Sequence, residues 1–165
     1  MCIRDSIYSL FKDSKGNVWV GTRTGLEYYN PANRLLVGYA DFIRSQVNDI
    51  LENGSGQIWF ATIGQGVFKH NLITNTWSHF KTISGNNPEG GKKVICLLAD
   101  QDGTVWAGTK GAGVALLDSG GNIVREYSKK DGLPDDVVYK ILKAPDGGVW
   151  GSTNNGLFRI DPTTV

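Results

Sequence analysis

Four of the five tryptophans in this 165-residue chain lie in nearly the same local sequence. Each has a glycine three residues before it and a threonine three residues after it, in the segments GNVWVGT, GQIWFAT, GTVWAGT and GGVWGST. These tryptophans are Trp19, Trp59, Trp106 and Trp150, so their spacings are 40, 47 and 44 residues. Self-similarity at a period of about 20–50 residues indicates a repeat protein in which one supersecondary unit is copied along the chain.

A full repeat reads as four short strands joined by tight turns. A β-branched residue lies twelve positions before each tryptophan, and a leucine or isoleucine lies nine positions before it. In the second repeat the turns contain Asn-Gly-Ser-Gly, Gly-Gln-Gly and Ile-Thr-Asn, which tolerate positive φ or cap their own backbone. Residues 43–51 and 137–142 also fit helical spacing. The equivalent stretch VICLLAD does not, so we predict strands at all of these places.

An antiparallel four-stranded unit of about 44 residues matches one blade of a β-propeller. We therefore predict an all-β chain that forms a partial or open propeller of about four blades. The expected blades are residues 7–44, 47–93, 94–136 and 137–165, the last one incomplete. A tryptophan at a constant position is expected to pack between neighbouring blades, with stacking on a ligand as the alternative.

The two ends of the chain do not fit this pattern. Residues 1–6, MCIRDS, have little strand character, and we expect them to be a non-native leader. The last repeat stops before its fourth strand, so the chain is expected to begin and end inside a larger propeller. The first and last blades would then expose apolar faces, and we expect the isolated chain to associate with itself.

Composition excludes several classes of protein. The formal net charge is +1, without the basic face that nucleic-acid binding needs. No apolar run approaches the length of a membrane-spanning helix. Cys2 and Cys96 are not spaced for a metal, and Cys96 in VICLLAD is expected to be a small buried apolar residue, with a disulfide as the alternative.

The repeats resemble those of the two-component regulator propeller family. The resemblance is carried by DGLPDDVVYKILKAPDGGVWGSTNNGLFRID at residues 131–161 and by SLFKDSKGNVWVGTRTGLEYYNP in the first repeat. The family's aspartate is present as Asp13 and Asp100, whereas Asn53 and Ala144 replace it in the other two repeats. Ala61 and Ser152 replace the glycine before the threonine.

This resemblance implies a function in signalling rather than catalysis. It implies a ligand-sensing or signal-transmitting segment in the periplasmic part of a bacterial hybrid histidine kinase that responds to a small molecule or oligosaccharide. The implied partners are that ligand, further propeller blades of the parent chain and a second receptor subunit in a homodimer. No nucleic acid, cofactor or metal is implied.

An enzyme would need reactive side chains in a recognisable catalytic arrangement. His70 and His79 fall on predicted outer strands and are expected to be surface or edge residues. No nucleophile elbow, P-loop or zinc-binding helix motif is present. We therefore predict no catalytic, cofactor-binding or metal-binding residues. The alternatives are a protein-interaction scaffold and a propeller enzyme similar to the streptogramin lyases.

A ligand site is expected on the face formed by the loops around residues 40–46, 82–93 and 128–136 and by the turn after each threonine. One residue singled out in that turn of each repeat differs from its counterparts while the flanks of the turn recur. The candidate ligand-binding residues are Arg23, Gln65, Lys110 and Asn154, and ordinary surface drift is the alternative explanation of their variety.

Overall fold

The computed structural model describes residues 5–161, apart from the side chains of residues 35–37 and 39, and within this range it is almost entirely β. Its strands form four antiparallel sheets in chain order. The first contains β1 (Ile7–Lys12), β2 (Val18–Thr22), β3 (Leu26–Asn30) and β4 (Leu35–Tyr39). The second contains β5 (Val47–Asn53), β6 (Gln57–Thr62), β7 (Val67–Asn71) and β8 (Thr76–Phe80).

The third sheet contains β9 (Val94–Ala99), β10 (Val105–Thr109), β11 (Val114–Leu117) and β12 (Ile123–Tyr127). The fourth contains β13 (Val138–Lys143), β14 (Val149–Thr153) and β15 (Gly156–Ile160). A short helix, α1 (Pro88–Gly91), and one 3-10 turn (Lys129–Asp131) lie in the connections between sheets. The segments with helical spacing are therefore strands, as the repeat predicts.

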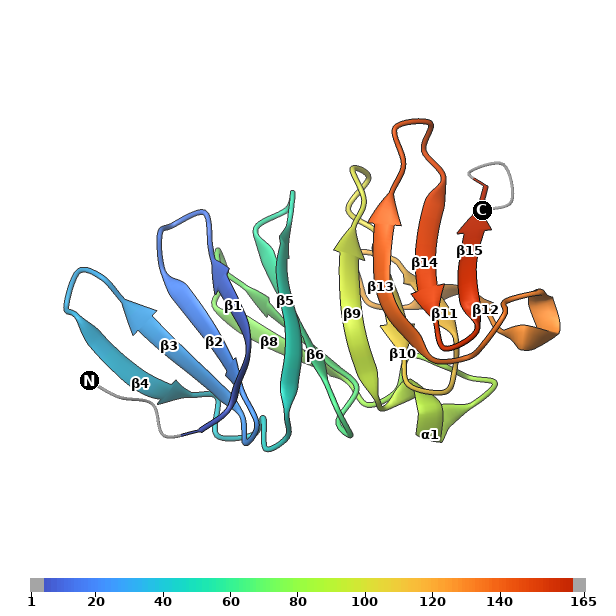
Figure 1. The fold of residues 1–165 in the computed structure, drawn as a ribbon. Coiled ribbons are helices and arrows are strands. Elements are labelled where there is room, and N and C mark those ends of the chain that lie inside the picture. Colours follow the sequence, from blue (N-terminus) through green and yellow to red (C-terminus); the bar gives the residue numbers. More distant parts are fainter. Residues whose placement is uncertain (1–4, 162–165) are drawn as a thin grey trace.

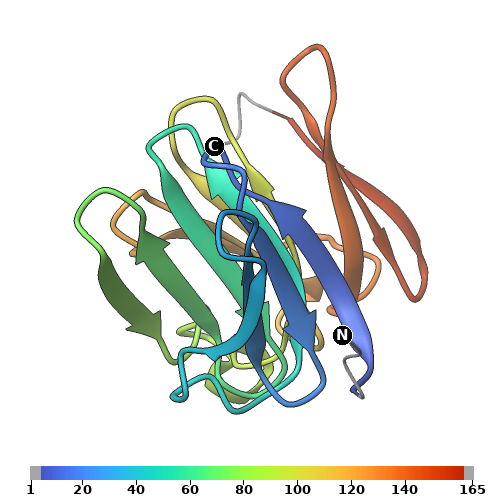
Figure 2. The same ribbon diagram turned by 90° about the vertical axis from the view of Figure 1, so that its left-hand side faces the viewer.

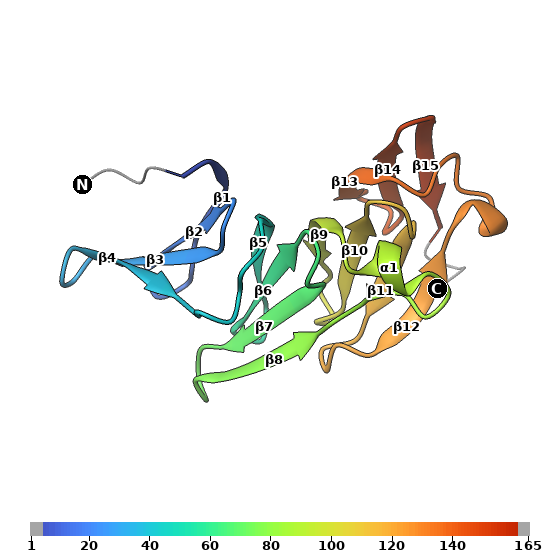
Figure 3. The same cartoon turned by 90° about the horizontal axis from the view of Figure 1, so that it is seen from below.

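The sheets stand beside one another like blades around an axis (Figure 1). The first strand of each sheet is the inner one, because β1 packs against β5, β5 against β9 and β9 against β13. Figure 3 shows these four inner strands along one side of the arc and the last strands away from it. Figure 2 looks from the first sheet, whose blue strands lie in front of the others. The all-β fold of open propeller blades is confirmed.

The repeated tryptophans fill the spaces between blades. Trp19, Trp59 and Trp106 are only 1%, 0% and 1% exposed, and Trp19 packs edge-on against Phe60 of the second sheet. Trp150, at the same position of the fourth sheet, is 43% exposed. It differs because no further sheet lies against β13–β15 in the described range. Packing between blades, rather than stacking on a ligand, accounts for the first three tryptophans.

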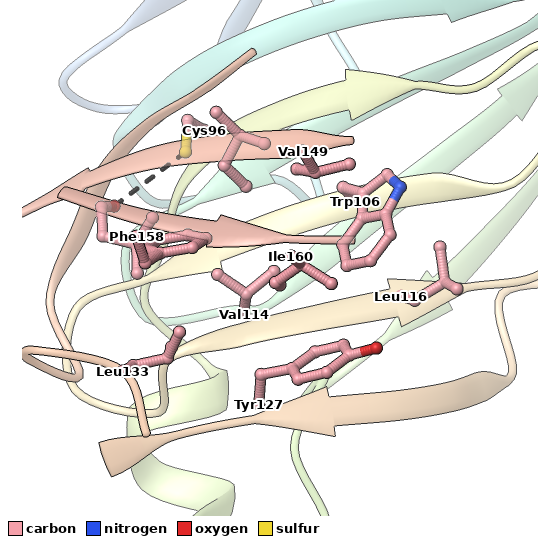
Figure 4. Packing of buried hydrophobic residues seen from close by; sticks show 11 residues of the cluster. Cys96, Trp106, Val114, Leu116, Tyr127, Leu133, Val149, Phe158 and Ile160 are labelled. Atoms are coloured by element: carbon pink, nitrogen blue, oxygen red, sulfur yellow. Dashed lines mark hydrogen bonds between the residues drawn. The ribbon is translucent and has the colours of Figure 1, made fainter. Parts of the chain in front are cut away.

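One such interface is drawn in Figure 4. Side chains of the third sheet, including Trp106 and Leu116, face Val149 and Ile160 of the fourth in a single apolar cluster. Cys96 belongs to this cluster as a buried free thiol, as expected. Burial raises the pKa of this thiol to about 12. Cys2 and the other residues of the predicted leader up to residue 4 lie outside the described residues.

In the first repeat, the aspartate holds both its own turn and the tryptophan. Asp13 is buried and accepts hydrogen bonds from the backbone N–H groups of Lys15 and Asn17 and from Nε1 of Trp19 at 2.9 Å. In the second repeat, Asn53 accepts the two equivalent backbone bonds at 3.2 Å. Nε1 of Trp59 is buried and has no hydrogen-bond partner within residues 5–161. Nε1 of Trp106 is likewise without a hydrogen-bond partner among the described residues although Asp100 is present, so the bond to the indole is made in the first repeat and not in the second or third.

Candidate functional site

The inner strands of all four sheets line one open cavity of about 780 Å³, which we call the axial cavity. Each inner strand contributes the residues eleven and ten positions before its tryptophan. These are Tyr8 and Ser9, Asn48 and Asp49, Ile95 and Cys96, and Tyr139 and Lys140. The remaining lining residues are Leu10, Gln46, Ile63 and Lys110. A cavity of this size lies within the range of about 300–1,000 Å³ that small-molecule sites occupy.

A β-bulge recurs at the same place in every inner strand. The pairing with the second strand shifts between Ile7 and Ser9, between Val47 and Asp49, and between Val138 and Lys140. In the third sheet, Thr109 pairs with Val94 while Gly108 pairs with Cys96, which is the same shift. The unpaired residues are Tyr8, Asn48, Ile95 and Tyr139. Because a bulge re-aims side chains, it presents this position to the axial cavity in each blade.

In the first three inner strands, the next residue ties its blade to the following one. Oγ of Ser9 donates to the carbonyl of Val47 at 3.2 Å. Oδ2 of Asp49 accepts from the N–H of Leu97 at 2.9 Å, and Sγ of Cys96 lies 3.9 Å from the carbonyl of Val138. Three different side chains thus form the same type of link between inner strands, so their first function is structural.

Asp49 is the acidic group of the axial cavity. Burial raises the pKa of its carboxyl, and the N–H bond from Leu97 and the charge of Lys140 act in the opposite direction. Its other oxygen, Oδ1, accepts from the N–H of Ile50 at 3.0 Å. Both carboxyl oxygens therefore accept a hydrogen bond from the backbone, while the half-buried side chain also lines the cavity.

The four predicted ligand-binding residues lie in equivalent turns but have different surroundings. Lys110 lines the axial cavity, with an exposed side chain. Asn154 accepts a hydrogen bond from the hydroxyl of Tyr139, so it holds a side chain of that cavity. Gln65 instead fastens the loop before β5: it accepts from the N–H of Arg44 at 2.8 Å and donates to the carbonyl of Phe42 at 3.2 Å. The exposed Arg23 contacts Ser6 through its backbone N–H.

The loops between sheets reach the same turns. The N–H groups of Gly64 and Gly66 donate to the carbonyl of Lys92, and those of Gly111 and Gly113 donate to the carbonyl of Asp136. The turns after β6 and β10 therefore share one face with the loops around residues 82–93 and 128–136, as expected. The side chains of Gln65, Lys110 and Asn154 fulfil separate roles on that face.

The prediction for His70 is wrong. This residue lies on β7 and is only 3% exposed, with its ring stacked on Trp77 at 4.5 Å between ring centres. Burial lowers the pKa of His70. The third strand of a blade is covered on both faces by neighbouring blades, which explains why it is not an edge residue. His79 lies on β8, is exposed, and has a ring nitrogen 2.7 Å from the carbonyl of Gln65.

Sequence reasoning missed most of the axial cavity, above all Tyr8, Asp49, Tyr139 and Lys140. A signal was present, because the positions eleven and ten before each tryptophan change from repeat to repeat between two recurring apolar positions.

Within residues 5–161 no cluster of three or more metal-ligating side chains occurs. No helix in that range has the length and apolar character needed to cross a membrane.

Several solved structures have the same fold as this chain. The extracellular domain of a putative one-component system from B. thetaiotaomicron superposes with a TM-score of 0.82 and 24% identity, over 97% of this chain and 24% of that one. The extracellular domain of a putative hybrid two-component system from the same organism gives 0.78 and 26%, over 97% and 22%. A catalytically inactive virginiamycin B lyase from Staphylococcus aureus, crystallised with quinupristin, gives 0.76 and 18%, over 96% and 53%.

The repeat family itself is matched at two places. Residues 3–24 and 88–111 match the two-component regulator propeller, which confirms the resemblance seen in the repeats. The chain spans about a quarter of the length of the two extracellular domains. Among curated proteins no relative matches.

Proposed function

We propose that this chain is a ligand-sensing or signal-transmitting propeller segment of a bacterial two-component sensor, and that it responds to carbohydrate without performing chemistry. Two matches to the two-component regulator propeller repeat support this proposal, as does the similarity to extracellular domains of signalling systems. The corresponding location is outside the cytoplasm, in the periplasm. The partners would be further blades of a parent chain and a second receptor subunit.

The axial cavity carries the proposal. Eight of its lining residues come from the same two positions of the four repeats, yet their side chains range from tyrosine to lysine. The flanking apolar positions keep their character, because they pack between blades. A constant scaffold that presents a variable lining to one cavity is the arrangement of a binding site.

The lyase alternative has support only at the level of the fold. The lyase superposes well but shares 18% of its residues with this chain. No inner strand of the chain carries a histidine, and His70 is enclosed between aromatic rings. The four inner strands therefore offer no imidazole as a general base at the axial cavity.

Carbohydrate binding by the 165-residue chain tests the proposed function. We expect a set of oligosaccharides to contain at least one that raises the melting temperature and binds in calorimetry. At a hundredfold excess over its Kd, a ligand stabilises the folded state by about 2.7 kcal/mol. The bound sugar should be recovered chemically unchanged by chromatography.

Two variants locate the binding. Lys110→Ala should weaken it, because Lys110 lines the axial cavity, whereas Arg23→Ala, in the equivalent turn outside that cavity, should leave it unchanged. Loss of binding in Arg23→Ala alone would place the ligand on the turn face instead. No binding of any sugar, or conversion of quinupristin by the chain, would overturn the proposal.

A further inference from the structure

The axial cavity has two cationic groups that form no ion pair within residues 5–161. Lys110, after β10, and Lys140, on β13, both line it and are both exposed. The ion pairs found within residues 5–161 involve Lys92, Lys143 and Arg159, and neither Lys110 nor Lys140 takes part in one. Two ammonium groups facing one cavity attract an anion into it.

The acidic group of the cavity does not cancel this charge by contact. Asp49 directs one carboxyl oxygen to the N–H of Leu97 in the next blade and the other to the N–H of Ile50. The carboxyl is half-buried, whereas both lysine side chains are exposed. With two lysines and one aspartate among its charged lining residues, the cavity keeps a net positive charge.

Two tyrosine rings supply apolar surface beside these charges. Tyr8 and Tyr139, both at bulge positions, are 48% and 50% exposed and line the same cavity. The hydroxyl of Tyr139 donates to Oδ1 of Asn154, which fixes the ring from the neighbouring turn. A half-exposed ring held in place offers a flat surface on which the C–H face of a sugar can pack.

We propose that the axial cavity binds an acidic sugar, with Lys110 and Lys140 contacting its carboxylate or sulfate and Tyr8 and Tyr139 packing against its ring. This inference rests on the proposed carbohydrate-sensing function and narrows its ligand class. Gln46 and Asn48, whose side chains hydrogen-bond to one another at the cavity wall, supply further polar groups for sugar hydroxyls.

Matched pairs of disaccharides test the ligand class. The probes are digalacturonic acid with digalactose of the same linkage, and a diglucuronic acid with its glucose counterpart. Calorimetry on the 165-residue chain at neutral pH should give tighter binding of the acidic member of at least one pair by tenfold or more. The advantage should shrink at high ionic strength, because salt screens exposed charges.

Single substitutions test the residues. Lys140→Ala and Lys110→Ala should each weaken binding of the acidic sugar by roughly tenfold, as expected for loss of a hydrogen bond to a charged group. Tyr139→Ala should weaken binding of both members of a pair. Lys81→Ala is the matched control, because Lys81 is exposed and does not line the cavity. Circular dichroism and the melting temperature verify that each variant is folded.

The outcomes separate the two proposals. Equal binding of acidic and neutral sugars would overturn the acidic ligand and leave carbohydrate sensing intact. Acidic preference that survives in Lys110→Ala and Lys140→Ala would overturn the axial cavity as its site. Binding of no probe of either kind would count against both the ligand class and the proposed function.

Discussion

At the scale of single residues, the chain contains its own comparison of aspartate with asparagine. Asp13 joins two backbone N–H groups to the indole of Trp19, whereas Asn53 keeps the turn and leaves the indole of Trp59 without a partner in the described range. The indole of Trp106 also lacks a partner among the described residues although its repeat keeps Asp100, so turn capping and indole binding are separable contributions. A buried donor that loses its acceptor costs about 1–3 kcal/mol.

Asp13→Ala is expected to lower the free energy of unfolding by about 3 kcal/mol, because it removes both contributions. Asp13→Asn should cost less, since it reproduces the arrangement at Asn53. Urea denaturation followed by tryptophan fluorescence measures both values. Equal losses in the two variants would contradict the separation of roles.

At the scale of elements, the inner-strand bulge explains an apparent conflict in the sequence. Val47 and Ile50 are three residues apart, a spacing that places side chains on opposite faces of a regular strand. Both nevertheless pack in the same apolar cluster with Trp19, since the unpaired Asn48 lies between them. The spacing that imitates a helix is therefore the sequence signature of the bulge.

Close approach of neighbouring blades next to this bulge requires a small residue on the second strand. A Cβ at Gly108 would lie 2.6 Å from Sγ of Cys96 and 2.9 Å from Cγ1 of Val138. Gly108→Ala should therefore destabilise the protein by about 1–3 kcal/mol through overpacking. Gly38→Ala, in β4 with no atom within 4 Å of the new Cβ, is the control. Thermal melts of both variants should differ clearly; similar melting temperatures would contradict the steric argument.

At the scale of the whole molecule, the first and fourth sheets expose apolar side chains at positions that are buried in other sheets. Leu142, Trp150 and Leu157 of the fourth sheet are exposed, whereas Val67 and Val114, the equivalents of Leu157, are fully buried. At the other end, Ile7 and Leu10 are exposed, whereas Val47 and Ile50 at the same positions are buried. Each end therefore has the apolar character of a blade-to-blade contact.

The 165-residue chain is consequently expected to associate with itself. The double variant Leu142→Lys/Leu157→Lys should shift it towards the monomer by placing two charges on the end face. Ile73→Lys, at an exposed position of the turn between β7 and β8, is the matched control and should not do so. Light scattering over a range of concentrations measures the effect. A monomer at every concentration in the original chain would contradict this expectation.

The sequence was sufficient to predict what all repeats share, and insufficient for what differs between them. The strands and the burial of Trp19, Trp59 and Trp106 follow from a pattern copied four times. Lys110 was among the predicted residues because its turn varies, but Tyr139 was not, because alternation in the strand breaks at the bulge. His70 was misplaced since the burial of a third strand depends on neighbouring blades rather than on local sequence.

The recurring bulge also lets the side chains that line the axial cavity differ from blade to blade without a change in the pairing of the strands. The unpaired residue takes no part in the regular ladder, so exchanging Tyr8, Asn48 or Tyr139 should leave the strand pairing in place, whereas Ile95 also packs against the cluster that contains Trp106. A combinatorial library at the first three positions would therefore sample new specificities on one unchanged scaffold. Successive copies of the repeat allow natural selection to explore ligands by the same route.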